Sequence, residues 1–471
     1  MATKARRFAI CCGILLQRGP IGLATCAAPI HAPFTLFPSP FPRREFDYAK
    51  AIQTDVSEMV QRVSRDHDFL QKSLEKTAVA DKFVERLLKI LDAVNRCVMK
   101  KPAVLLILRS DYMLDGKVNE QSLTCLRQIE VNTVSSALAG QATRMPELHR
   151  YTCALRDDLT SDGQKDQIPD NPVVDEIATG IAAAWQAYGS SSTVVVMLVG
   201  CDESNVFDQL LVEDALLMNH GINMVRCIFD DIVKGGSMQV SVNRDGTAFI
   251  GNHEVAVFYF RHGYNPLHYS TEKHWDARLL IEKSRSVVCP SVAEQLAGTK
   301  RVQMELGRPG VLERFVNSSA ASRIRETFCN MYSLDLTDEG NEVAVRAVAN
   351  PQLYVMKSER EGGGSIVAGE SMKSRLNECF TSKERSSFIL MDKVFAPVSK
   401  SYIIHSEQAA DFVEVDVVSE LGVYGVYVKN TITSEVEMNT VAGHLLRTKN
   451  AQTEGGGVVH GTAAFDSPLL V

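Results

Sequence analysis

The fold is decided by the stretch Lys357-Ser-Glu-Arg-Glu-Gly-Gly-Gly-Ser365, which follows the apolar residues 353–356. Three consecutive glycines lose much conformational entropy on folding, so they favour a place where a ligand or another backbone comes close. Backbone N–H groups of such a loop bind phosphate, Lys357 adds positive charge, and Glu361 is suited to holding a magnesium ion. A flexible surface hairpin is the alternative interpretation. The spacing fits neither the Walker A loop nor the dinucleotide-binding glycine motif, so another nucleotide-binding architecture is needed.

Length and charge are those of an ordinary enzyme-sized protein. The chain has 471 residues, enough for two or three domains, and a formal net charge of -7. An acidic chain is a poor match for nucleic acid, whose phosphates need clustered lysine and arginine. The best apolar runs, 103–108 and 194–199, are far shorter than a spanning helix. We therefore expect neither a nucleic-acid partner nor a membrane span.

Cysteine usage and the N-terminus bear on location. The eleven cysteines include no Cys-x-x-Cys, and they are predicted to be reduced core thiols of a cytoplasmic protein. Basic residues at 4, 6 and 7 precede the apolar run 8–16, as in a signal or transit peptide. Residues 17–20 interrupt this run, and the segment is nearly devoid of serine. We expect the first residues to belong to the folded protein, with a targeting segment as the alternative.

The first third of the chain is predicted to be helices and one buried strand. Apolar residues recur on one face through 46–100, as in helices that cover a sheet. Four prolines in 32–42 exclude a helix and predict an extended strap over the surface. Residues 103–108 form a buried strand, and Arg109 follows at its carboxyl end, where open α/β sheets place ligands. Arg109 is thus a candidate anion ligand, with a surface salt bridge as the alternative.

Residues 128–133 suggest a cation site. In a strand, Glu130 and Asn132 point to the same face, opposite to their apolar neighbours. A carboxylate and an amide oxygen suit a hard cation, and Glu361 would make three oxygen ligands for magnesium. The alternative is that this face is only the solvated side of an edge strand.

Two further regions complete the pattern. A helix is predicted over 173–188, followed by a strand over 193–199, a second helix and a strand over 222–228. The second helix begins with the polar residues Glu203, Asn205 and Gln209. This strand–helix–strand (βαβ) order is typical of a small substrate-binding module. Near the C-terminus, 388–394 is predicted to be a strand whose exposed backbone could pair with an adenine edge. Several strands are expected within 412–429, and the glycine stretch 454–461 is predicted to close on the site together with the first loop.

These stretches are similar to those of the eukaryotic-type glutathione synthetases, which are ATP-grasp ligases. The resemblance runs in family order from about residue 9 to the C-terminus. It is carried by Ala32-Pro-Phe-Thr-Leu-Phe-Pro38, Arg109-Ser-Asp-Tyr-Met113, Gln128-Ile-Glu-Val-Asn-Thr133, Arg261-His-Gly-Tyr264, Gln295-Leu-Ala-Gly-Thr-Lys300, Arg360-Glu-Gly-Gly-Gly364, Ser419-Glu-Leu-Gly422, Gly443-His-Leu-Leu-Arg-Thr-Lys449 and Asp466-Ser-Pro468.

The resemblance implies an α/β (α+β) class protein with a permuted ATP-grasp fold. It further implies an inserted αβ substrate module, a glycine-rich lid and a homodimer. We expect the ATP-grasp body to begin in 1–192, the substrate module to occupy 193–300, and the ATP-binding part with the lid to occupy 301–471. The implied reaction uses ATP and Mg²⁺ to phosphorylate the cysteinyl carboxylate of γ-glutamylcysteine, after which the amine of glycine displaces phosphate to give glutathione.

The resemblance also implies roles for individual residues, carried over position by position. The expected magnesium ligands are Glu130, Asn132 and Glu361. The expected nucleotide contacts are Glu130, Lys300, Lys357, Glu361, Gly362, Gly363, Gly364, Met391, Asp392, Lys393, Val394, Glu420 and Lys449. The expected substrate contacts are Arg109, Ser135, Glu203, Asn205, Gln209, Arg261, Tyr264, Arg447, Val458 and Val459. Arg109, Lys357 and Arg447 are expected to act in catalysis by alignment and charge stabilisation, without a covalent nucleophile.

Several positions depart from the family pattern. The glycine loop usually reads Lys-Pro-Gln-Arg-Glu-Gly-Gly-Gly-Asn-Asn, whereas residues 358, 359, 365 and 366 differ here. His262 stands where an acidic residue is common, Ala137 where serine is frequent, and Val459 where alanine is frequent. The alternatives are a catalytically weak paralogue that binds nucleotide or thiol peptide as a dimer partner, and a ligase with another acceptor such as β-alanine.

Overall fold

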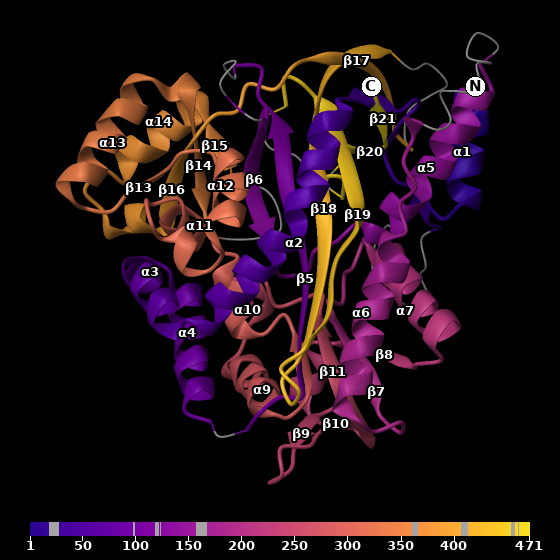
Figure 1. The fold of residues 1–471 in the computed structure, drawn as a ribbon, viewed down its shortest axis with the longest axis vertical. Helices are drawn as coiled ribbons and strands as arrows, with labels where there is room; N and C mark the ends of the chain where they lie inside the picture. Colours follow the sequence, from indigo (N-terminus) through magenta and orange to yellow (C-terminus); the bar gives the residue numbers. More distant parts are fainter. Residues whose placement is uncertain are drawn as a thin grey trace.

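The computed structural model describes residues 1–17, 28–97, 99–117, 122, 124–156, 167–359, 366–406, 413–453, 457–459 and 461–471. Its centre is a mostly antiparallel sheet (Figure 1). The strand order is β17 (Ser399–Ile404), β3 (Phe34–Thr35), β20 (Ala464–Asp466), β19 (Val436–Asn450), β18 (Glu414–Asn430), β5 (Ala103–Leu114) and β6 (Leu126–Asn132). The mixed α/β class and the ATP-grasp-type architecture expected from the sequence are confirmed.

Helices cover both faces of this sheet. Helices α2 (Arg43–Arg65), α5 (Ala139–Ala154) and α6 (Val173–Tyr188) pack against its strands. Helix α1 (Ala2–Cys11) packs on α5, and α3 (His67–Ala80) and α4 (Lys82–Asn95) follow α2 and pack against each other. Successive residues of β18 point to opposite faces. A side chain at Gly425 would meet Gln53 and Ser57 of α2, whereas the next residue, Val426, lies against Gly180 of α6. This part of β18 is therefore enclosed between α2 and α6 and is buried on both sides.

The second unit is the predicted αβ module. Its sheet has the order β8 (Met224–Ile228), β7 (Val194–Val199), β11 (His253–Phe260), β10 (Ala248–Ile250) and β9 (Val240–Val242), with β12 (Val287–Cys289) parallel to β11. Its helices are α7 (Val206–His220), α8 (Asp231–Lys234), α9 (Glu272–Lys283) and α10 (Val292–Ala297). Gly189 and Gly221 end α6 and α7 at φ values of 83° and 67°, which glycine adopts without strain. The βαβ outline expected over 193–228 is confirmed.

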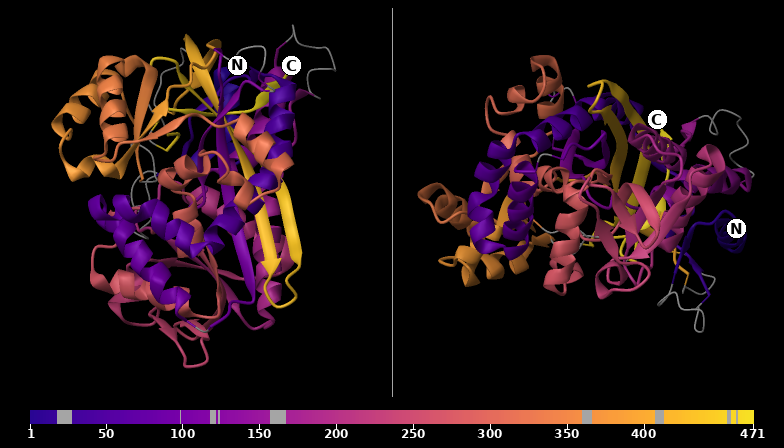
Figure 2. Two further views of the ribbon diagram at one scale, coloured as in Figure 1. Left: turned by 60° about the vertical axis from the view of Figure 1, so that its left-hand side comes forward. Right: turned by 90° about the horizontal axis from the view of Figure 1, so that it is seen from below.

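The third unit is the lid, which stands beside one end of the central sheet (Figures 1 and 2). It consists of β13 (Met331–Ser333), β16 (Phe388–Asp392), β14 (Tyr354–Ser358) and β15 (Ile366–Ala368), in that order, with α13 (Asp338–Ala349) and α14 (Gly369–Glu378). Helices α11 (Lys300–Leu306) and α12 (Ser318–Glu326) precede it in the chain. The predicted glycine-rich loop at 360–365 lies outside the described residues. The domain boundaries at 192 and 300 stay predictions.

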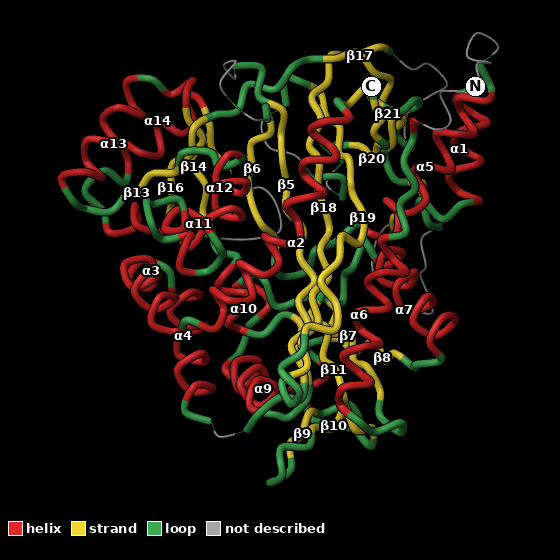
Figure 3. Tube along the Cα trace, in the orientation of Figure 1, coloured by secondary structure: helices red, strands yellow, loops and turns green. Residues whose placement is uncertain are grey.

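Four expectations about individual elements are wrong. The strap over 32–42 is extended, but its apolar side chains are buried, because β3 joins the central sheet and β4 (Ser39–Phe41) pairs with β21 (Pro468–Leu470). The strand that begins at Ala103 runs on to Leu114, so Arg109 lies within it. Residues 414–430 form one continuous strand (Figure 3). The backbone of β16 is not free, because β13 and β14 pair with its two edges.

The remaining features concern the N-terminus and the thiols. The short strands β1 (Leu15–Leu16) and β2 (Ile30–His31) pair, and the ring of Phe8 in α1 stacks on Tyr151 of α5 with 4.1 Å between centroids. Cys227, Cys289 and Cys379 are buried as expected, but Cys11 and Cys201 are exposed. None of the helices in the described part of the chain combines the length and the apolar composition needed to cross a bilayer.

The contact of α6 with the central sheet provides a test of the packing. A Cβ atom at Gly180 would lie 2.3 Å from Cγ1 of Val426, a stiff β-branched side chain. We expect this overlap to outweigh the roughly 1 kcal/mol that alanine gains over glycine in a helix. Gly180→Ala should therefore lower the free energy of unfolding by about 1–2 kcal/mol in urea titrations. Thr179→Ala, at an exposed position of the same helix, is the control, and a more stable Gly180→Ala protein would contradict this packing.

Candidate functional site

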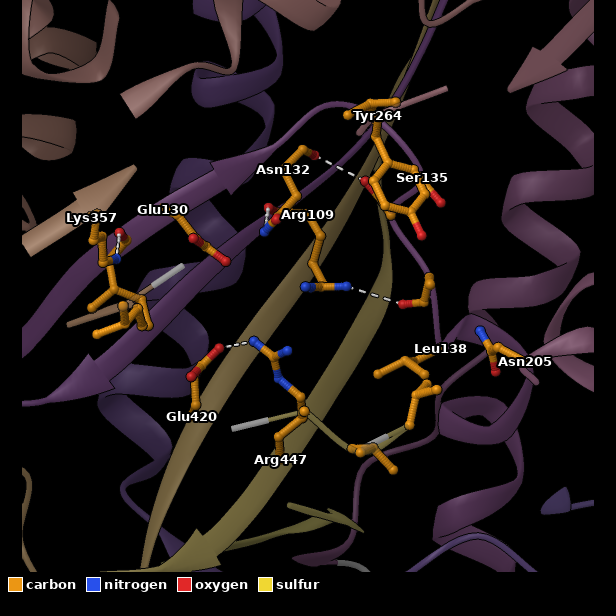
Figure 4. A pocket seen from close by; sticks show the side chains of 18 of the residues that line it. Arg109, Glu130, Asn132, Ser135, Leu138, Asn205, Tyr264, Lys357, Glu420 and Arg447 are labelled. Atoms are coloured by element: carbon orange, nitrogen blue, oxygen red, sulfur yellow. Dashed lines mark hydrogen bonds and ion pairs between the residues drawn. The ribbon is translucent and has the colours of Figure 1, made fainter. Parts of the chain in front are cut away.

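A cavity of about 940 Å³ opens between the three units. The central sheet, the αβ module and the lid each contribute polar side chains to its walls (Figure 4). The predicted site residues that line it are Arg109, Glu130, Asn132, Ser135, Glu203, Asn205, Arg261, Tyr264, Lys300, Lys357, Met391, Lys393, Val394, Glu420, Arg447, Lys449, Val458 and Val459. Segments separated by more than 300 residues in the sequence thus meet at one place.

The other predicted site residues do not line this cavity or lie outside the described residues. Glu361 and the glycines at 362–364 belong to the latter group. Gln209 is buried; its Nε2 donates to Glu203 at 2.7 Å, and its Oε1 accepts from Arg226 at 2.6 Å. The carboxylate of Asp392 accepts from Asn330 at 2.8 Å, and Asp392 does not line the cavity. Asp392 thus has no direct part in the cavity wall, whereas Gln209 acts indirectly, because its hydrogen bond holds the carboxylate of Glu203 in place.

Arg109 is buried in the middle of β5, which excludes a surface salt bridge. Its Nε and Nη2 donate to the two carboxylate oxygens of Asp111 at 2.6 and 2.8 Å. Its Nη1 donates to the backbone oxygen of Ala137 at 3.0 Å, a contact visible in Figure 4. The departure from serine at position 137 leaves this contact unchanged, because the contact uses the backbone.

Glu130 and Asn132 lie on the same face of β6, and both line the cavity. Burial raises the pKa of Glu130, but the positive charges of Lys300 and Lys357, with other neighbours, lower it to about 2. The nearest of these, Nζ of Lys300, is 3.7 Å from a carboxylate oxygen. Glu130 is thus ionised at neutral pH. Among the residues that the structure describes, no three His, Cys, Asp or Glu side chains gather closely enough to hold a metal ion.

The lid reaches the central sheet through Lys357. This residue is at the end of β14, and its Nζ donates to the backbone oxygen of Ile129 in β6 at 2.8 Å. Lys300, at the start of α11, is also buried against the cavity. Two ammonium groups and a carboxylate from different units therefore meet where a polyphosphate would need positive charge.

The αβ module contributes a buried cluster of hydrogen bonds centred on Asp208, a residue that the sequence analysis missed. The side chain of Asp208 is fully buried and accepts from Nη2 of Arg261 at 2.5 Å. It also accepts from the backbone N–H groups of Leu138 and Gly140 at 3.0 and 2.7 Å. Ser135 and Leu138 have positive φ values, so this loop needs such anchoring. The position of Asp208 on the first turn of a helix, three residues after Asn205, was the available signal.

Arg447 and Glu420 face each other at the other end of the cavity, on paired positions of β19 and β18 (Figure 4). They form an ion pair, and Nη2 of Arg447 also donates to Asp111 at 3.0 Å. Val458 and Val459 line the same cavity; Val458 is buried, whereas Val459 is 37% exposed. Asp111 is the second residue that sequence analysis missed, although it lies inside the quoted stretch 109–113.

His262 changes the charge next to Arg261. Burial lowers the pKa of His262 to about 4, so this ring is uncharged beside Arg261. Its ring stacks on His268 with 3.5 Å between centroids, and both rings line the cavity. A side chain at Gly200 would come within 2.9 Å of this ring, so glycine is needed there. The pair makes an uncharged wall behind the arginine.

Comparisons with known proteins show the family to which the sequence is similar. The family model described as eukaryotic glutathione synthase, ATP binding domain, matches residues 1–470. The chain is 40% identical to the glutathione synthetase of Xenopus laevis over 442 residues, which cover 93% of this chain and 90% of the relative. It is 39% identical to that of Homo sapiens, over 94% of this chain and 90% of the relative.

A more distant relative and a solved structure extend the comparison. The chloroplastic glutathione synthetase of Solanum lycopersicum is 38% identical over 94% of this chain and 78% of the relative. A solved structure of a glutathione synthetase-like effector from Globodera pallida, in its apo form, superposes with a TM-score of 0.77. It is 22% identical, and the match covers 100% of this chain and 96% of that protein. This structural similarity shows that the two proteins share a fold.

Proposed function

Because this chain belongs to the eukaryotic glutathione synthase family, we propose that it joins γ-glutamylcysteine to glycine and converts ATP to ADP and phosphate. The observation that supports this most is the common cavity, where lysines of the lid side face arginines of the central sheet and the αβ module. A nucleotide and two carboxylate substrates need this number of positive groups in one place.

The proposed reaction has two steps. A carboxylate oxygen of γ-glutamylcysteine attacks the terminal phosphorus of ATP, and the bond to ADP breaks, which leaves an acyl phosphate. The amine of glycine then attacks the acyl carbon, phosphate leaves, and the amine loses a proton. The chain provides alignment and charge for both steps, since neither needs a covalent nucleophile.

Arg109 and Arg261 are suited to the donor substrate. A guanidinium has five N–H groups, and Arg109 uses three of them on Asp111 and Ala137, which leaves two for a carboxylate or phosphate oxygen. Arg261 is held by Asp208, and it lines the same wall as Ser135, Glu203 and Tyr264. Glu203 offers a carboxylate to the amino group of the γ-glutamyl unit. We assign Arg447 to the carboxylate of the acceptor.

The nucleotide is assigned to the lid side of the cavity. Lys300 and Lys357 offer positive charge to its phosphates, and Glu420 and Lys449 lie beyond them along the central sheet. The side chains of Met391, Lys393 and Val394 line the cavity where β16 ends, so they would contact the base. This role comes from the side chains, because the strand itself is paired on both edges.

The residues present fit a magnesium ion. Glu130 is an ionised carboxylate in the cavity wall. The amide of Asn132 donates from Nδ2 to Asp111 at 2.9 Å, so its Oδ1 is the atom available to a cation. These two side chains, with Glu361, would hold the ion, and a bound magnesium would offset the charge of the phosphate oxygens.

Phosphate release is the direct test of this function. Purified protein with ATP, Mg²⁺ and γ-glutamylcysteine should release phosphate in a glycine-dependent manner and form glutathione, and a chelator should abolish both.

Glu130→Gln and Glu361→Gln should each reduce kcat by about 100-fold or more, because a ligand charge beside polyphosphate is lost. Glu435→Gln, at an exposed turn, is the control. Near-normal turnover of both site variants would refute the magnesium assignment. Release of phosphate without any response to glycine would indicate another acceptor.

The size of the acceptor is proposed to depend on Val459. This side chain lines the same cavity as Arg447, and we propose that its bulk limits how far the amine end extends. Glycine should be preferred over β-alanine and serine in a competition assay, by about 10- to 100-fold per added group. Val459→Ala should narrow this preference, whereas Val436→Ala, an exposed position outside the cavity, should not. A parent protein that prefers β-alanine, or ratios that Val459→Ala leaves unchanged, would argue against this role.

We also propose a homodimer in the cytoplasm, as the family resemblance and the scattered free thiols suggest. Sedimentation equilibrium of the purified protein should give twice the chain mass of 51.9 kDa. Mass spectrometry of the protein from its native source should find helix α1 retained. A mature N-terminus near residue 28 would show that the first segment is a targeting sequence.

A further inference from the structure

Asp111 has no assigned role, yet it lies at the centre of the polar groups beneath the cavity. Its side chain is fully buried and does not line the cavity. It accepts four hydrogen bonds: two from Arg109, at 2.6 and 2.8 Å, one from Arg447 at 3.0 Å and one from Asn132 at 2.9 Å. All three partners do line the cavity. One carboxylate therefore connects three side chains that face the ligands.

The backbone leaves space for this arrangement at one place in the sheet. Arg109 and Asp111 are on β5 and Arg447 is on β19, with β18 between these strands. The residue of β18 opposite Asp111 is Gly422. A Cβ atom at Gly422 would lie 2.6 Å from Cδ of Arg109 and 2.8 Å from Oδ1 of Asp111. The two arginines can share one carboxylate across β18 because this position has no side chain.

Charge explains why the shared carboxylate matters. The buried guanidinium of Arg109 and the largely buried guanidinium of Arg447 repel each other, and without a partner each would lose hydration at a large cost. Burial lowers the pKa of Arg447, and Asp111 is the strongest of the groups that oppose this effect. Each hydrogen bond from Asp111 also fixes the plane of a guanidinium, which decides where the remaining N–H groups point.

We propose that Asp111 is a positioning residue that holds Arg109 and Arg447 at the separation and orientation in which they receive the two carboxylate substrates. This inference rests on the proposed function. Through Nδ2 of Asn132, the same carboxylate sets the orientation of that amide. Asp111 does not touch a substrate, so its loss acts through the arginines and should affect the substrates that they bind.

The test is steady-state kinetics of Asp111→Asn, a change that keeps the shape and removes the charge. The KM values for glycine and for γ-glutamylcysteine should each rise about tenfold or more, since fixed charge-assisted hydrogen bonds are lost. The KM for ATP should rise less than these two values, because the lysines that face the nucleotide do not contact Asp111, which reaches the nucleotide side only through the amide of Asn132. A purely structural role would instead leave all three KM values unchanged or shift them together, and either result overturns the proposal.

A matched control and a second variant keep the test decisive. Glu282 is also a buried carboxylate bonded to an arginine, Arg278, but neither residue lines the cavity. Glu282→Gln should lower stability without the selective change in KM. If Asp111→Asn does not fold, Gly422→Ala is measured in its place, because its new methyl group displaces Asp111 and Arg109 without altering charge. It should raise the same two KM values, and an ATP-selective effect would overturn the proposal.

Further variants distinguish this inference from the proposed function. An inactive parent protein would refute the function itself, whereas an active parent with unaltered KM values in Asp111→Asn would refute only the role of Asp111. Asp111→Glu restores the charge and should recover part of the affinity for glycine. The effect of Asp111→Asn on the KM for glycine should also be smaller in an Arg447→Gln background, because one of the two arginines through which Asp111 acts is then already lost. Fully additive effects would contradict the coupling.

Discussion

The site depends on the pairing of β18 with β5 on one edge and β19 on the other. Polar side chains on these strands can meet only while the register is kept, because a shift by one residue would turn each of them to the opposite face. The same strands are buried further along between α2 and α6, where apolar packing fixes the register. Apolar packing in the core thus fixes the strand register, and the register in turn fixes the positions of the charged groups at the other end of the sheet.

Burial of so many charges is possible because they are shared. Asp111 serves Arg109 and Arg447, Asp208 serves Arg261 and two backbone N–H groups, and the lysines around Glu130 keep it ionised. A buried ion pair contributes little net stability, since desolvation offsets attraction. Under the proposed function, these groups are therefore better explained by the ligands that the cavity receives than by the stability of the fold.

Much of this architecture could be predicted from the sequence. Strong periodicity located the helix over 173–188 and the strands at 103 and 194, and Glu130 and Asn132 were expected on one face. The end of β5 was not predictable, because Arg109 and Asp111 are polar residues that a strand buries only when they pair with each other and with Arg447. Asp208 was missed for the same reason, since its partners come from a loop 70 residues away. Ion pairs between residues far apart in the sequence do not alter the local hydrophobic periodicity, so this periodicity cannot predict them.

The hydrogen bond from Lys357 to the backbone of Ile129 has a consequence for the catalytic cycle. It joins the lid to the central sheet in the conformation described. Any outward rotation of the lid breaks this bond and exposes a buried ammonium group to water. Under the proposed function, entry of the nucleotide and departure of ADP would therefore be linked to the hydration of Lys357 whenever they require the lid to move.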